Sequence, residues 1–137
     1  MKTITLIALW GLLASSFPID SPNIKGTWQA VRAQYGSEPM QEIKDKTILK
    51  TFTGTRWSAA WYNKDQKLFD GAGGGTYLLK GNQYTETVEY YSWDAPTVGK
   101  TFTFIVSIEN GMLHQSGYIE YRDNKKYIID EWYKKID

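Results

Sequence analysis

The stretch at residues 71–91, GAGGGTYLLKGNQYTETVEYY, decides the fold that this sequence predicts. A glycine-rich segment leads into a strand, the turn Lys80-Gly81-Asn82 reverses the chain, and a second strand follows. Side chains alternate along this second strand, and its more apolar face carries Tyr84, Glu86, Val88 and Tyr90. A hairpin this rich in tyrosine, with a glutamate on that face, is typical of the wall of a small antiparallel barrel. The glycines are explained by sharp turning and close strand approach.

Further strand-like segments lie on both sides of this hairpin, at residues 25–35, 47–53, 56–62, 67–70, 100–109, 112–121 and 126–135. Asn110-Gly111 is the strongest hairpin signal among their connections. Short turns favour strands that run up and down as neighbours, and closure of the sheet removes its exposed edges. The sequence therefore predicts an all-β chain that forms a single antiparallel up-and-down barrel of about eight strands. A flattened sandwich is the alternative. The polar segment 36–46 is expected to be a loop or short helix over the barrel mouth.

Length and composition narrow the function classes. A chain of 137 residues forms one domain. Its 16 basic and 15 acidic residues are spread along the chain, so it has no electrostatic footprint for nucleic acid or an anionic membrane. The absence of cysteine excludes disulfides and thiolate metal sites, and a single histidine excludes a histidine-rich metal centre. We therefore expect no metal and no cofactor.

The first sixteen residues have the pattern of a signal peptide. Lys2 gives a positive start, residues 4–14 are apolar, and Ala14-Ser15-Ser16 offers the small residues that a signal peptidase reads. We expect cleavage after Ser16, a leader at residues 17–24, and a barrel domain at residues 25–137. A retained membrane anchor is the alternative. The mature protein is then exported, with no membrane span, to the periplasm or the exterior of a bacterial cell.

Several short motifs occur in a characteristic order: Gly26-Thr27-Trp28, Gly74-Gly75-Thr76-Tyr77, Tyr84-Thr85-Glu86, Gln115-x-Gly117 and an acidic-x-Trp-x-basic close at residues 130–134. Their order and spacing resemble a family of small exported lipocalin-like proteins of Bacteroidetes, most of them uncharacterised. The resemblance covers residues 25–135 and implies a calycin-type barrel. Unlike a typical secreted lipocalin, this chain has no cysteine and no room for a C-terminal helix.

The leading functional prediction is a monomer that binds a small apolar or amphipathic molecule in the barrel, without catalysis. The candidate ligand-binding residues are Arg32, Trp57, Trp61, Glu86, Tyr90 and His114. Trp57 and Trp61 share a face with the small Ala59, which leaves either a groove or ordinary core packing. Arg32 has the parity of Trp28 and is expected inside, where it would meet a ligand carboxylate or pair with Glu86 or Glu131. An outward Arg32 is the alternative.

Other residues are given structural or alternative roles. Trp28 is expected to seal the base of the barrel, with Trp132 and Lys134 close by. His114 is either a wall residue or the general base of an isomerase or hydrolase that also uses a glutamate. Another alternative is a barrel with a filled core that binds or inhibits a protein of the cell envelope.

Overall fold

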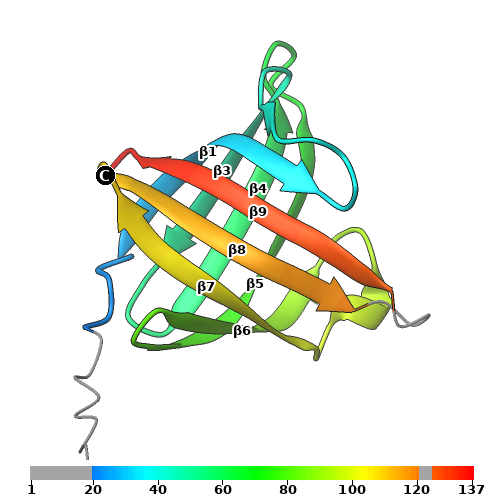
Figure 1. Cartoon of the computed structure of the whole chain (residues 1–137). Coiled ribbons are helices and arrows are strands. Elements are labelled where there is room, and N and C mark those ends of the chain that lie inside the picture. The colour runs from blue at the N-terminus through cyan, green and yellow to red at the C-terminus, as the bar shows by residue number, and fades with distance from the viewer. Residues whose placement is uncertain (1–19, 121–124) are drawn as a thin grey trace, which may run out of the picture.

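The sheet of this protein closes on itself. A computed structural model describes residues 20–120 and 125–137. Neighbouring strands follow the order β2-β1-β3-β4-β5-β6-β7-β8-β9, and β9 also pairs with β1 (Figure 1). The elements are β1 (Gly26–Tyr35), β2 (Gln41–Glu42), β3 (Lys46–Phe52), β4 (Arg56–Asn63), β5 (Phe69–Lys80), β6 (Gln83–Tyr91), the 3-10 helix η1 (Ala95–Thr97), β7 (Thr101–Glu109), β8 (Met112–Glu120) and β9 (Lys126–Lys135). Since β2 is only a two-residue strand beside β1, the predicted up-and-down barrel of about eight strands is confirmed.

The two predicted tight turns are present. Asn110 and Gly111 join β7 to β8 with φ angles of 52° and 76°, and two positive φ values are what a type I′ hairpin turn requires. Gly81 joins β5 to β6 with φ 56°, the conformation that a type II′ turn needs at its first central position. Both turns match the right-handed twist of the strands, so consecutive strands become neighbours.

One end of the barrel is filled with apolar side chains. Trp28 at the start of β1 is 2% exposed, and its indole N–H donates to the carbonyl of Ile24 at 2.8 Å. Ile24 is itself buried, although it falls in the segment expected to be a leader. Trp132 and Lys134 do not join this seal, because β9 turns Glu131 and Tyr133 inward and the intervening positions outward. The ammonium of Lys135 lies 5.6 Å from the Trp28 ring instead.

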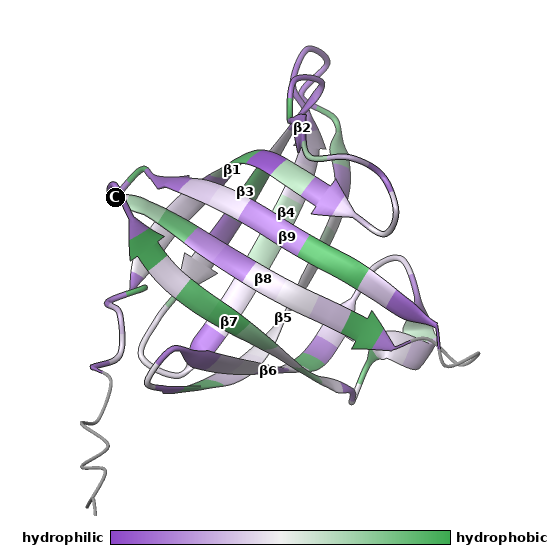
Figure 2. Ribbon diagram, viewed as in Figure 1, coloured by the Kyte–Doolittle hydropathy of each residue, from purple (hydrophilic) through white to green (hydrophobic). Residues whose placement is uncertain are grey.

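The strands alternate in hydropathy as a half-buried barrel wall should (Figure 2). Register shifts in three strand pairs interrupt this alternation. The register between β1 and β9 shifts between Ala30 and Arg32, that between β5 and β6 shifts between Gly74 and Gly75, and that between β4 and β5 shifts between Trp61 and Tyr62. A single extra residue sends every later side chain of the bulged strand to the opposite face. These bulges lie toward the mouth, so the expected facing of the residues of β1 and β6 near the mouth is reversed.

The glycine run lies inside a strand, which corrects the prediction of a short strand at residues 67–70 followed by a glycine lead-in. Gly71 to Gly75 all belong to the twelve-residue β5. A Cβ on Gly75 would come within 1.9 Å of the Thr87 carbonyl oxygen, and one on Gly71 within 2.1 Å of the Trp93 ring. The glycines therefore permit close strand approach and make room for aromatic rings, which is the reason the sequence suggested for them.

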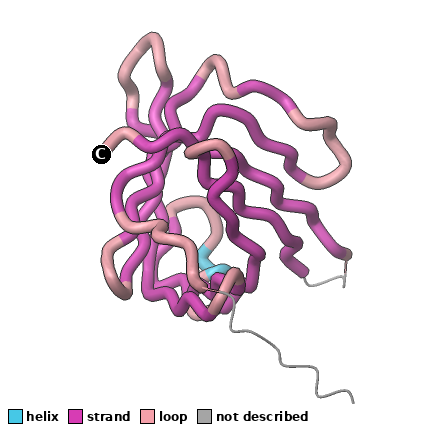
Figure 3. The backbone as a smooth tube through the Cα atoms, turned by 60° about the vertical axis from the view of Figure 1, so that its left-hand side comes forward, coloured by secondary structure: helices cyan, strands magenta, loops and turns pink. Residues whose placement is uncertain are grey.

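Two connecting segments lie at the open end of the barrel. β1 pairs with β3 only over Gly26–Gln29, and further along it pairs with β2. The segment 36–46 is therefore partly extended and contains no helix. Of the two predicted forms, a loop or a short helix, the structure shows the loop. The segment after β6 contains η1, the short helix drawn in Figure 3. Asp94 and Thr97 from this region line the cavity.

Candidate functional site

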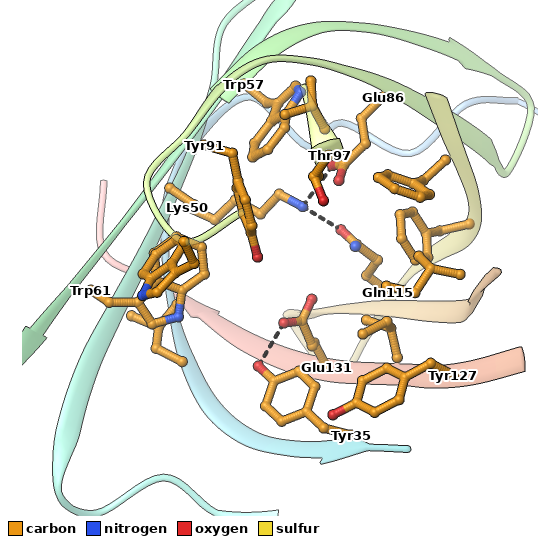
Figure 4. A pocket seen from close by; sticks show the side chains of 18 of the residues that line it. Tyr35, Lys50, Trp57, Trp61, Glu86, Tyr91, Thr97, Gln115, Tyr127 and Glu131 are labelled. Carbon is orange, nitrogen blue, oxygen red and sulfur yellow. Dashed lines mark hydrogen bonds and ion pairs between the residues drawn. The ribbon is translucent and has the colours of Figure 1, made fainter. Parts of the chain in front are cut away.

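The interior of the barrel holds a cavity of about 530 Å³ between the filled end and the mouth. Its walls come from strands all round the barrel, and Figure 4 shows their side chains converging on the space. Among the residues that line the cavity are Tyr35, Lys50, Trp57, Trp61, Glu86, Tyr91, Trp93, Gln115, Glu131 and Tyr133. The premise of a filled core, on which the protein-binding alternative was built, is therefore not met.

A buried ion pair forms one polar cluster of the cavity. Lys50 on β3 is 5% exposed, and its Nζ lies 3.0 Å from Glu86 Oε2 and donates to Gln115 Oε1, also at 3.0 Å. The Tyr84 hydroxyl donates to the same Glu86 oxygen at 2.7 Å. Lys50 lies on β3, Glu86 and Tyr84 lie on β6, and Gln115 lies on β8, so the cluster joins three separate strands of the closed sheet. A charge buried at this depth is stable only when it is paired and hydrogen-bonded, and each of these groups is.

A second buried carboxylate lies on β9. Glu131 is 7% exposed, and each of its oxygens accepts a hydrogen bond from a phenol. Tyr35 donates to Oε1 at 2.8 Å (Figure 4), and Tyr133 donates to Oε2 at 2.7 Å. No ion pair with Glu131 forms among the residues that the structure describes. The cavity therefore contains one neutralised carboxylate and one that only neutral hydroxyls stabilise.

Three tyrosine hydroxyls of these clusters are locked in the protonated form. Burial raises the pKa of Tyr84 well above its usual value of 10.0, and the adjacent Glu86 carboxylate raises it further. Burial and then the Glu131 carboxylate raise the pKa of Tyr133 and of Tyr35 in the same direction. A phenol that cannot ionise remains a donor, so both carboxylates keep their hydrogen bonds throughout the neutral pH range.

Aromatic rings line the outer part of the cavity. The ring centroids of Trp61 and Trp93 lie 4.5 Å apart at an interplanar angle of 84°, and those of Tyr91 and Trp93 lie 5.0 Å apart at 61°. Such edge-to-face pairs fix the rings against each other. Charged residues of both signs complete the rim, among them Lys46, Asp70, Lys100 and Glu120.

Three of the six predicted ligand-binding residues line the cavity, namely Trp57, Trp61 and Glu86. Arg32 and Tyr90 do not, and the bulges in β1 and β6 explain the two corrections. Arg32 is exposed on the outer face, with its guanidinium carbon 4.4 Å from the centroid of the Trp132 ring. Tyr90 is 47% exposed, and its neighbour Tyr91 points into the cavity instead.

His114 also lies on the outer face, because β8 turns Leu113 and Gln115 inward. Its ring stacks on Trp132 at 4.0 Å and 11°. Its Nε2 lies 3.0 Å from Asp130, and its Nδ1 lies 3.4 Å from Glu109. The residue has carboxylate neighbours, as the enzyme alternative supposed, but they and the ring are outside the cavity.

Lys50, Gln115 and Tyr35 were not predicted as cavity residues from the sequence, and Glu131 was considered as a partner for Arg32 but not as a ligand-binding residue. One signal was available for Lys50, which alternates with Ile48 and Phe52 and therefore shares their face. Gln115 similarly follows Leu113 at the spacing of one face. A polar residue inside an apolar alternation is the pattern that identifies both.

The closed sheet and the hollow interior together define a small lipocalin-like barrel. The structure is similar to that of a lipocalin-like protein from Bacteroides uniformis, with a TM-score of 0.56 and 19% identity, over 82% of this chain and 97% of that chain. It is also similar to an uncharacterised protein from Bacteroides eggerthii, with a TM-score of 0.49 and 18% identity, over 78% and 98% of the two chains. No protein-family model matches the sequence, and neither does any curated protein. At such identities the likeness shows the fold alone.

Residues 20–120 and 125–137 contain neither a helix of membrane-spanning character nor a metal-binding cluster. No helix there is both long enough and apolar enough to cross a membrane. No group of three or more histidine, aspartate or glutamate side chains in that part of the chain is arranged to hold a metal ion.

Proposed function

We propose that this protein binds a small apolar or amphipathic molecule in the cavity of its barrel, without catalysis, as an exported lipocalin-like protein of the Bacteroidetes type. The cavity of about 530 Å³ carries the proposal. Small-molecule sites in proteins span roughly 300–1,000 Å³ and combine apolar walls with a few fixed polar groups. Here the indoles of Trp57 and Trp61 supply contact area, and the Lys50–Glu86–Gln115 cluster supplies fixed polarity.

The chemistry of the interior favours binding over turnover. The sole histidine of the chain, which the alternative of an isomerase or hydrolase requires, is on the outer face. The polar groups of the cavity are held by one another, since every buried side-chain nitrogen and oxygen in the described residues has a hydrogen-bond partner. Groups fixed in this way orient a guest.

Reducing the cavity should weaken binding. Ala59 lies on the inner face of β4, and Ala60 follows it on the outer side. Ala59→Leu is expected to lower the affinity for the neutral fluorophore N-phenyl-1-naphthylamine about tenfold or more, because overfilling a packed site costs about 1–3 kcal/mol. The measurement is a titration of the increase in fluorescence of the bound probe.

The matched control is Ala60→Leu, which adds the same side chain outside the barrel. It should bind the probe as the natural protein does. If the natural protein does not bind the probe, or if both variants lose affinity equally, the cavity is not the binding site.

The cellular location is part of the proposal. It is supported by Lys2, the apolar run at residues 4–14 and the small residues Ala14-Ser15-Ser16, all of which lie outside the described residues. Protein isolated from the producing cell should begin at Phe17 when its N-terminus is sequenced, and native mass spectrometry should give the mass of one chain. A mature chain that still begins with Met1 would contradict the export signal.

A further inference from the structure

We propose that the cavity selects guests that carry a positive charge, with an ammonium group held at Glu131 and an apolar body between the rings nearer the mouth. This inference rests on the proposed function and adds the charge of the ligand to it. The observation behind it is an imbalance of charge: among the residues that the structure describes, the buried interior contains two carboxylates, Glu86 and Glu131, and one cation, Lys50.

The Lys50 charge is already neutralised. Its Nζ is 3.0 Å from Glu86 and 3.0 Å from Gln115, and the rings of Phe52, Trp57 and Tyr84 lie 5.0–5.5 Å away. A ligand carboxylate would therefore have to compete with Glu86 for this ammonium. Because Glu86 is part of the wall and is positioned without further loss of entropy, the competition favours the internal pair.

In residues 20–120 and 125–137, Glu131 has no such counter-charge. Its two hydrogen bonds come from the hydroxyls of Tyr35 and Tyr133, which are neutral and remain donors because burial and the carboxylate itself raise their pKa values. An ionised carboxylate offers about four acceptor positions, and these two donors occupy only two of them. A buried anion gains most from a cationic partner that supplies further donors, which is what a ligand ammonium provides.

The approach to Glu131 also suits a cation. Trp61, Tyr91 and Trp93 form an aromatic cluster that lines the same cavity nearer the mouth. The faces of indole and phenol rings attract ammonium groups and also pack against alkyl chains. A primary alkylamine can therefore pack its alkyl chain against these rings and place its nitrogen beside the Glu131 carboxylate.

Three straight-chain probes with the same number of carbon atoms separate charge from hydrophobicity. Dodecylammonium, dodecan-1-ol and dodecanoate, each below its micelle concentration at pH 7, would be used to displace N-phenyl-1-naphthylamine from the natural protein. We expect dodecylammonium to displace it at a concentration about tenfold lower than dodecanol, and lower again than dodecanoate. Equal or tighter binding of dodecanoate would overturn the charge inference and leave the proposed function standing. If no probe binds, both fail.

Two variants then locate the effect. Glu131→Gln keeps the shape of the side chain and removes its charge, so it should abolish the preference for dodecylammonium over dodecanol. Glu38→Gln removes an exposed glutamate and should retain the full preference. A Glu131→Gln variant that folds and still prefers the ammonium would overturn the assignment of the site. If that variant fails to fold, the ranking of the three probes on the natural protein still decides the charge preference.

Discussion

Lys50→Met should destabilise the protein by about 3–5 kcal/mol, which is the usual cost of removing one partner from a buried ion pair. The substitution keeps the length of the side chain but leaves Glu86 buried, with only the Tyr84 hydroxyl to stabilise its charge. Gln115 loses its donor at the same time. Urea unfolding followed by tryptophan fluorescence measures the loss, because several tryptophans lie in or beside the core.

Two further variants make this test specific. Lys46→Met removes the lysine at the exposed start of the same strand, and it should change the free energy of unfolding by no more than about 0.5 kcal/mol. Lys50→Met combined with Glu86→Gln removes both charges and should recover most of the stability that the single variant loses. A Lys50→Met protein as stable as the natural one would show that the pair is not buried and coupled as described.

Alkaline pH should unfold the protein steeply. The folded protein raises the pKa values of Tyr35, Tyr84 and Tyr133 above 10.0, so it keeps three protons that the unfolded chain releases. The stability that these phenols contribute is therefore complete below pH 10 and is lost as the pH rises above it. Each proton contributes about 1.4 kcal/mol per pH unit, or about 4 kcal/mol per unit for the three together.

Urea unfolding at a series of pH values above 10 measures this slope, and the ultraviolet absorbance of phenolate reports the ionisation itself. Tyr84→Phe removes one of the three protons and should reduce the slope by about a third. Tyr118→Phe changes a tyrosine on the outer face and is the matched control. Reversible titration of all ten tyrosines near pH 10 in protein that remains folded would contradict the buried clusters.

The fold could be predicted because its signals are local. The turns at Gly81 and Asn110-Gly111 determine which strands are neighbours, and the alternation of Tyr84, Glu86 and Val88 orients one wall of the barrel. These features depend on residues a few positions apart, and the backbone geometry of a tight turn restricts which residue types it accepts. Closure follows from the number of strands and from the exposed edges that an open sheet would leave.

The site could be predicted only in part because bulges determine which side chains point into the barrel. A bulge is defined by the pairing of two strands, and the extra residue opposite β9 or β5 leaves no clear mark in the sequence. Strict alternation of side chains, continued through each bulge, wrongly assigned Arg32 and Tyr90 to the inner face of the barrel. Trp57, Trp61 and Glu86 lie before any bulge in their own strands, and for them the count was right.

The polar clusters needed three-dimensional information of another kind. Lys50, Glu86 and Gln115 are 65 positions apart from first to last, and only the closed sheet brings their side chains together. Sequence alternation can place each of them on an inner face, but it does not show which charge neutralises which. Arg32 was therefore expected as a partner of Glu86, and only the paired strands show that Lys50 takes that place.

The most direct test of the central claim is a crystal structure of the protein grown with dodecylammonium. We expect an alkyl chain inside the barrel against Trp61, Tyr91 and Trp93, with the ligand nitrogen about 3 Å from a Glu131 carboxylate oxygen. An interior filled by its own side chains, or a probe bound only on the outer face, would contradict it.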